Sequence, residues 1–179
     1  METLEVIARP HFDADDAAWL KDIRERRAGS RGPPYFTLVF FPGSDLTPHD
    51  FAEHVRAVAQ ATPRIRFRLR SALVAPEPTV ARFHVFLAPD EGFGAIQTLH
   101  DALHTGPVEP ALHQERPYLP HVTVATESSF AEARAIARSL NNGGIDIIGH
   151  IDALEIERRS GDVVRTVGQA PLAKAGWFA

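Results

Sequence analysis

The feature that most constrains the fold is an order of elements that occurs twice along the chain. Apolar periodicity and cap residues predict helix, strand, helix, strand, strand in each half. The strand predicted at residues 35–41, YFTLVFF, and the strand predicted at residues 121–126, HVTVAT, hold equivalent places, and each has threonine third. A duplicated unit predicts an α+β, bilobal fold in which two mainly antiparallel sheets face a central groove and helices lie outside. We therefore expect residues 1–179 to form a single domain of two pseudo-symmetric lobes.

Cap residues mark the helices most clearly. Asp13, Thr47 and Ser129 each precede an amphipathic stretch and are typical N-cap residues, so a helix is predicted after each of them. A fourth helix is predicted within residues 92–106. Further strands are predicted at Leu4–Ala8, Ile65–Ala75, Arg82–Leu87, Ile151–Arg158 and Val163–Val167, and a long loop at residues 106–120.

Composition limits the kinds of partner. Hydrophobic residues make up 44% of the 179 residues, which is enough for a sizeable core. The net charge of −4 argues against wrapping long nucleic acid. No apolar run has the length of a membrane span, the N-terminus lacks the basic start of a signal peptide, and there is no cysteine, so we expect a cytoplasmic protein without a membrane partner.

One local exception is the basic stretch RIRFRLR, which places Arg64, Arg66, Arg68 and Arg70 on one face of a predicted strand. Two interpretations stay open. In the first, these arginines form an outer face, because charged strand faces usually point to solvent. In the second, they form a positively charged wall that attracts phosphate.

Strand alternation predicts where the reactive side chains lie. His121, Thr123 and Ala125 are expected on one strand face, and Tyr35, Thr37 and Val39 on the equivalent face of the other half. If a pseudo-two-fold axis relates the halves, both faces meet at the groove. A histidine transfers protons near neutral pH, and a threonine hydroxyl donates to phosphate oxygens, so this arrangement favours phosphoryl chemistry.

The stretch RPYLPHVTVA, with Tyr118 and Pro120 before His121 and Thr123, resembles the second motif of the two-histidine (2H) phosphoesterase superfamily, which includes the 2'-5' RNA ligase-like proteins and cyclic phosphodiesterases. The order of elements resembles that bilobal fold along nearly the whole chain. The stretch PPYFTLVF resembles the first motif with tyrosine in place of histidine at Tyr35 and with Thr37 kept. The resemblance implies phosphodiester chemistry at RNA ends or nucleotides without metal or cofactor. It implies catalytic roles for His121, Thr123, Thr37 and Tyr35, and substrate binding by Tyr118, Arg116 and His84.

The tyrosine leaves three outcomes open. The protein binds phosphate esters without turnover, it turns them over slowly with Tyr35 as acid, or another histidine supplies the missing group, for which His84 is the best candidate. A tyrosine hydroxyl, with an ordinary pKa near 10, is a poor base at neutral pH. Replacing Tyr35 by histidine is therefore expected to raise activity.

The sequence leaves two classes of function open. The first is a 2'-5' RNA ligase-like or 2',3'-cyclic phosphodiesterase-type enzyme with reduced activity. The second is a non-catalytic binder of a nucleotide or RNA terminus that uses the same groove. His100 and His104 share a helix face, but the glutamate of a zinc-binding HExxH motif is absent, so no metal site is expected.

Overall fold

Two antiparallel sheets form the frame of the protein. The computed structural model describes residues 2–29, 32–42, 46–77, 81–112, 117–161 and 163–174. One sheet has the strand order β3-β1-β8-β9 and the other β2-β7-β4-β5-β6. The strands are β1 (Glu2–Ala8), β2 (His11–Phe12), β3 (Phe36–Phe41), β4 (Ile65–Pro76), β5 (Phe83–Glu91), β6 (Val122–Glu127), β7 (Ile147–Ile151), β8 (Ala153–Ser160) and β9 (Val163–Pro171).

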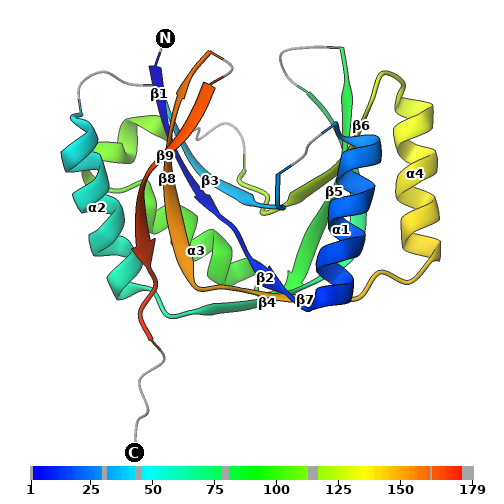
Figure 1. Ribbon diagram of the computed structural model, residues 1–179, viewed down its shortest axis with the longest axis horizontal. Coiled ribbons are helices and arrows are strands. Elements are labelled where there is room, and N and C mark those ends of the chain that lie inside the picture. The colour runs from blue at the N-terminus through cyan, green and yellow to red at the C-terminus, as the bar shows by residue number, and fades with distance from the viewer. Residues whose placement is uncertain are drawn as a thin grey trace, which may run out of the picture.

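Four α-helices cover the outer faces of the sheets. They are α1 (Ala14–Arg27), α2 (Pro48–Ala61), α3 (Phe93–Leu103) and α4 (Phe130–Asn142). The predicted caps are confirmed, because the side chains of Asp13, Thr47 and Ser129 each accept a hydrogen bond from the backbone N–H three residues on. In Figure 1, α2 lies on one side of the molecule and α1 and α4 on the other, with β3 and β6 between them. The α+β bilobal fold is thereby confirmed.

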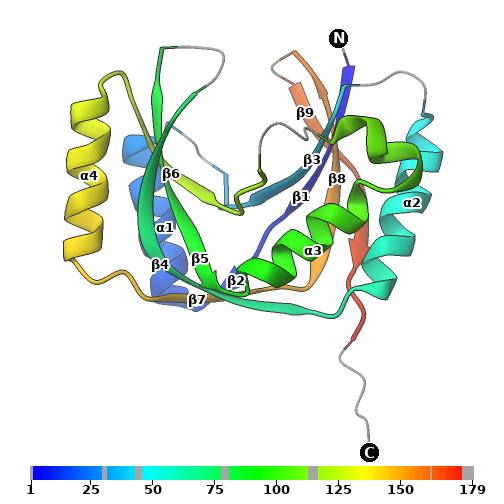
Figure 2. The same cartoon turned by 180° about the vertical axis from the view of Figure 1, so that it is seen from behind.

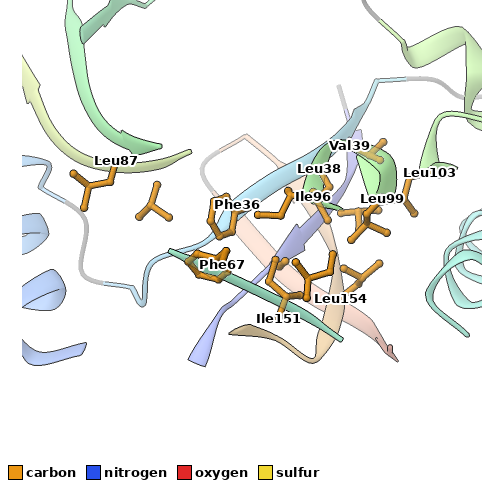
Figure 3. Close-up of a cluster of buried hydrophobic side chains, with 14 of the residues drawn as sticks. Phe36, Leu38, Val39, Phe67, Leu87, Ile96, Leu99, Leu103, Ile151 and Leu154 are labelled. Carbon is orange, nitrogen blue, oxygen red and sulfur yellow. The ribbon is translucent and has the colours of Figure 1, made fainter. Parts of the chain in front are cut away.

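The buried core packs between these layers. Phe36, Phe67 and Phe12 form edge-to-face ring contacts, and Figure 3 shows Phe36 and Phe67 side by side at the centre of the core. Gly92 begins α3 with φ of 79° and lies so close to β4 that an added Cβ would stand 2.5 Å from the carbonyl oxygen of Arg66. This close approach places α3 across both sheets, as the view from behind shows (Figure 2).

The two strands that carry the threonines share an irregularity that the sequence did not reveal. On β3, Thr37 pairs with Ile7 and Val39 with Val6, so Leu38 is an extra residue. On β6, Thr123 pairs with Phe86 and Ala125 with Val85, so Val124 is an extra residue. Each is a β-bulge, which reverses the alternation of side chains beyond it.

The bulges correct the predicted faces. Val39 and Ala125 were expected beside the threonines, but both point into the core and are at most 1% exposed. Phe40 and Thr126 take their places on the groove side, since Phe40 pairs with Glu5 and Thr126 with His84. The predicted faces are correct up to the threonines and wrong beyond them.

The remaining differences concern short elements. β2 and β7 were not predicted as strands, and the loop predicted at residues 106–120 contains a 3-10 helix at Gly106–Ala111. Two interpretations of the basic stretch were open, and the outer-face interpretation is confirmed. Arg66 pairs with Glu91, Arg68 with Asp146 and Arg70 with Asp90.

Candidate functional site

A cavity of about 620 Å³ lies between the lobes. Strand β3 of one sheet contributes Thr37 and Phe40, and strand β5 of the other contributes His84 and Phe86. Helix α3 and the segment before β6 complete the wall with His100, Asp101, His104, Tyr118 and His121. The volume falls in the range of small-molecule sites, and the mixture of aromatic and titratable side chains suits a nucleotide-sized ligand.

His121 is the most constrained of the predicted site residues. It directly precedes β6, and its ring packs on Phe86 with 4.6 Å between ring centroids. Its Nδ1 lies 2.7 Å from the carbonyl oxygen of Leu119 and can only donate to that acceptor. Burial, with a smaller contribution from the charge of His84, lowers the pKa of His121 below the usual 6.5. The ring is therefore neutral at pH 7, and its Nε2 carries the lone pair.

Thr37 reaches the same cavity from the opposite sheet. The hydroxyl of Tyr118 donates to the carbonyl oxygen of Thr37 over 2.9 Å, which joins the segment before β6 to β3. The Tyr118 ring also stacks on His100, with centroids 3.9 Å apart and planes 5° apart. Burial raises the pKa of Tyr118, so the phenol stays protonated and keeps this hydrogen bond. The cavity wall is thus fixed by an aromatic residue that the sequence had singled out.

His84 faces the cavity, which sequence alone left open. Its Nδ1 lies 3.0 Å from the Thr126 hydroxyl oxygen, and its Nε2 bonds to the carboxylate of Glu77. Both His84 and Glu77 line the cavity, together with His121.

Tyr35 and Thr123 lie elsewhere in the groove region: of the described residues, these two predicted site residues do not line the cavity. Arg24 of α1 connects them. Its Nε donates to the carbonyl oxygen of Thr123 over 3.1 Å, and its guanidinium carbon lies 5.7 Å from the centre of the Tyr35 ring. Arg9 lies at the same distance from that ring. Tyr35 thus contacts two cations.

Besides the stretch RIRFRLR, the sequence offers Arg31 and Arg116 as candidate phosphate-binding arginines. Arg66, Arg68 and Arg70 are ion-paired on the outside, as described above. Arg31 and Arg116 lie outside the described residues, so the predicted substrate contact of Arg116 stays a prediction. Among the described arginines, Arg9 and Arg24 contact the ring of Tyr35 in the altered motif.

The histidines of α3 are buried rather than exposed. His100 and His104 lie with ring centroids 4.2 Å apart, and the Nδ1 atoms contact the Asp101 carboxylate and the His100 carbonyl oxygen. Within the part of the chain that the structure describes, no group of three or more histidine, cysteine, aspartate or glutamate side chains is arranged to hold a metal ion. In the same described residues, no helix is long and apolar enough to cross a membrane.

Sequence reasoning missed Arg24, Arg9 and Glu77. Arg24 had a usable signal, because it lies four residues after Leu20 and one after Ile23, on the face of α1 that packs inward. Arg9 and Glu77 follow strand ends, and nothing in their local sequence indicated that they face the groove.

Two facing sheets with a histidine-bearing cavity between them define a bilobal phosphoesterase-type fold of the 2H superfamily. The family model described as the 2'-5' RNA ligase superfamily matches residues 12–163. The chain belongs to this superfamily. A search of the curated proteins returns no match.

Solved structures agree with this fold. TT0787 of Thermus thermophilus is 17% identical with a TM-score of 0.65, and the match covers 97% of this chain and 100% of that one. LigT of E. coli is 14% identical with a TM-score of 0.58, covering 97% and 99%. Usb1 of Kluyveromyces marxianus is 13% identical with a TM-score of 0.53, covering 95% and 98%. At these identities the likeness concerns the fold.

Proposed function

We propose that this protein is a phosphodiesterase of the 2',3'-cyclic type that acts on nucleotides or RNA ends, with His121 as general base. The observation that carries the proposal is the state of His121. A neutral imidazole is held by its Nδ1 on the Leu119 carbonyl oxygen, in a cavity that Thr37 enters from the other sheet. A base of this kind removes the proton of an attacking oxygen through Nε2.

Related structures support the class of ligand. LigT has been solved with 3'-AMP, with NADP+ and with ATP, and Usb1 with uridine monophosphate. The cavity here has aromatic side chains, Phe40, Phe86 and Tyr118, that suit a nucleobase. Thr37 suits a phosphate oxygen. We propose that the reaction needs no metal ion, since His121 and a second protein group supply the proton transfers.

The test is turnover of a panel of 2',3'-cyclic nucleotides by the wild type and by His121→Ala. We expect the variant to lose about 10²–10⁴-fold in kcat/KM, the usual contribution of a general base. His49→Ala, an exposed histidine on α2, is the matched control and keeps wild-type activity. Addition of EDTA leaves the wild-type rate unchanged.

The pH profile provides a second readout of the same proposal. Because burial lowers the pKa of His121, the base is neutral to lower pH than an ordinary histidine. The acid limb of kcat/KM should therefore lie below pH 6.5. Nucleotide binding without any turnover would instead support the second class of function, a non-catalytic nucleotide binder.

A further inference from the structure

The first motif does not supply an evident second proton-transfer group. Of the described residues, Tyr35 is outside the cavity lining, and its ring lies 5.7 Å from each of the Arg9 and Arg24 guanidinium carbons. An in-line displacement at phosphorus needs an acid for the leaving oxygen as well as a base for the attacking one. That acid is therefore expected among the residues that line the cavity.

His84 has a position and a geometry that suit this acid. It lies two residues before Phe86 on β5, on the same strand face, and the His121 ring packs on Phe86. His84 and His121 both line the cavity, so the two rings face the same ligand space. Thr37 faces both from the other sheet.

The two histidines are held in the same way. Each Nδ1 has a fixed partner, the Leu119 carbonyl oxygen for His121 and the Thr126 hydroxyl for His84. For His121 this leaves Nε2 as the atom for chemistry in the cavity. The Nε2 of His84 contacts the carboxylate of Glu77, which also lines the cavity. The bulge on β6 makes the arrangement possible, because it turns Thr126 toward His84.

We propose that His84, with Glu77 as its positioning residue, is the second proton-transfer group of this site and replaces the histidine that Tyr35 displaces from the first motif. This inference rests on the proposed function. The two catalytic histidines then come from neighbouring strands of one sheet, while the other sheet contributes Thr37.

The proton balance is complete with these two groups. Water attacks the phosphorus of a 2',3'-cyclic phosphate, and its proton passes to Nε2 of His121. One ribose oxygen–phosphorus bond breaks, its electron pair stays on the ribose oxygen, and this oxygen takes the proton from Nε2 of His84. The products are a phosphate monoester with one free ribose hydroxyl, a protonated His121 and a neutral His84, which exchange protons with solvent before the next turnover.

The groups around His84 fit this role. The titratable groups that face it are Glu77 from the segment after β4 and His121 from the segment before β6, and the strand neighbours on its face are Phe86, Thr126 and Ala75. A carboxylate can only accept, so the Nε2 of His84 carries the hydrogen of this bond and points it into the cavity wall formed with Glu77. The proposed step requires the leaving oxygen to take the place of the Glu77 carboxylate at Nε2.

The experiment compares two substrates that differ in their need for an acid. In a 2',3'-cyclic nucleotide the leaving group is a ribose alkoxide, which must be protonated. In a p-nitrophenyl phosphodiester the leaving group is a stable phenolate, which needs no acid. We expect His84→Gln to lose about 10²-fold in kcat on the cyclic nucleotide and less than about threefold on the p-nitrophenyl ester. Glu77→Gln should show the same selectivity with a several-fold loss.

Two comparisons make the result decisive. His121→Ala should lose activity on both substrates, because the attacking oxygen needs a base in each case, and Tyr35→Phe should keep the wild-type rate on both. Equal losses of His84→Gln on the two substrates, or no loss, would overturn the role of His84 while the phosphodiesterase function stands. A loss in Tyr35→Phe that occurs on the cyclic nucleotide and not on the p-nitrophenyl ester would assign the role to Tyr35 instead.

A wild type that turns over neither substrate overturns both proposals. Retained cleavage of the p-nitrophenyl ester shows that His84→Gln and Glu77→Gln are folded.

Discussion

The two lobes share a β-bulge at the same place in their motif strands but differ in the side chains around it. On β3 and on β6 a bulge follows the threonine of the motif, at equivalent register positions on the neighbouring strand, Ile7 opposite Thr37 and Phe86 opposite Thr123. On the groove side beyond the bulge, one lobe has Phe40 paired with Glu5, and the other has Thr126 paired with His84. The first lobe therefore has a carboxylate, Glu5, at the position equivalent to His84.

The groove face of the first lobe is filled by ion pairs. Glu5 is 4% exposed and pairs with Arg159, while Arg9 pairs with Glu155 and Glu157. The second lobe presents Phe86, His84 and His121 in more apolar surroundings. A histidine works as a neutral base where burial disfavours its charged form, and a surface of fixed charges holds side chains in place. Under the proposed function, one lobe therefore carries the proton chemistry, and the other supplies the fixed charges that hold side chains in place.

The largest expected effect tests the connection between the lobes. Arg24 is 4% exposed and donates to the carbonyl oxygens of Thr123 and Gly32. Arg24→Leu removes the charged donor from both of these part-buried hydrogen bonds, so we expect it to lower the free energy of unfolding by about 3 kcal/mol. Urea unfolding measures the change. Arg26→Leu, at an exposed position of the same helix, should stay within about 0.5 kcal/mol of wild type. Similar stabilities of the two variants would show that Arg24 does not hold the lobes together.

A smaller effect separates the two threonines. Thr37 lines the cavity and Thr123 does not, among the residues described. Thr37→Val should weaken binding of a 2',3'-cyclic nucleotide about tenfold, the value of one hydrogen bond to a charged group, and Thr123→Val about twofold or less. Calorimetry measures both. Equal tenfold losses would contradict this difference and show that both threonine hydroxyls bind the phosphate.

The smallest effect concerns Tyr35. Its replacement by histidine was expected from the sequence to raise activity, but its position outside the cavity lining changes that expectation. A histidine here would contact Arg9 and Arg24 rather than the substrate, so Tyr35→His should alter kcat/KM less than about threefold. Steady-state kinetics on the cyclic nucleotide decides the point. A rate increase of tenfold or more would mean that the first motif still reaches the reacting phosphate and that the lobes are functionally alike.

Local signals in the sequence predicted most of the frame. Asp13, Thr47 and Ser129 marked helix starts because a side-chain oxygen that caps a free N–H acts within four residues. β7 was missed at residues 147–151 because IIGHI is only five residues long and has a glycine at its centre, and it is fixed as a strand by its pairing with β4 and β2. Long-range pairing of this kind leaves no local trace.

The sequence by itself determined that two equivalent strands carry threonines and that one of them begins with a histidine, because these facts reside in the order of residues. Only the tertiary structure decided which side chains meet. The bulges turned Val39 and Ala125 inward and Thr126 outward, the register of β5 turned His84 into the cavity, and the packing of α1 brought Arg24 between Tyr35 and Thr123. Each of these outcomes depends on hydrogen bonds or contacts between segments far apart in the chain, which no local pattern encodes.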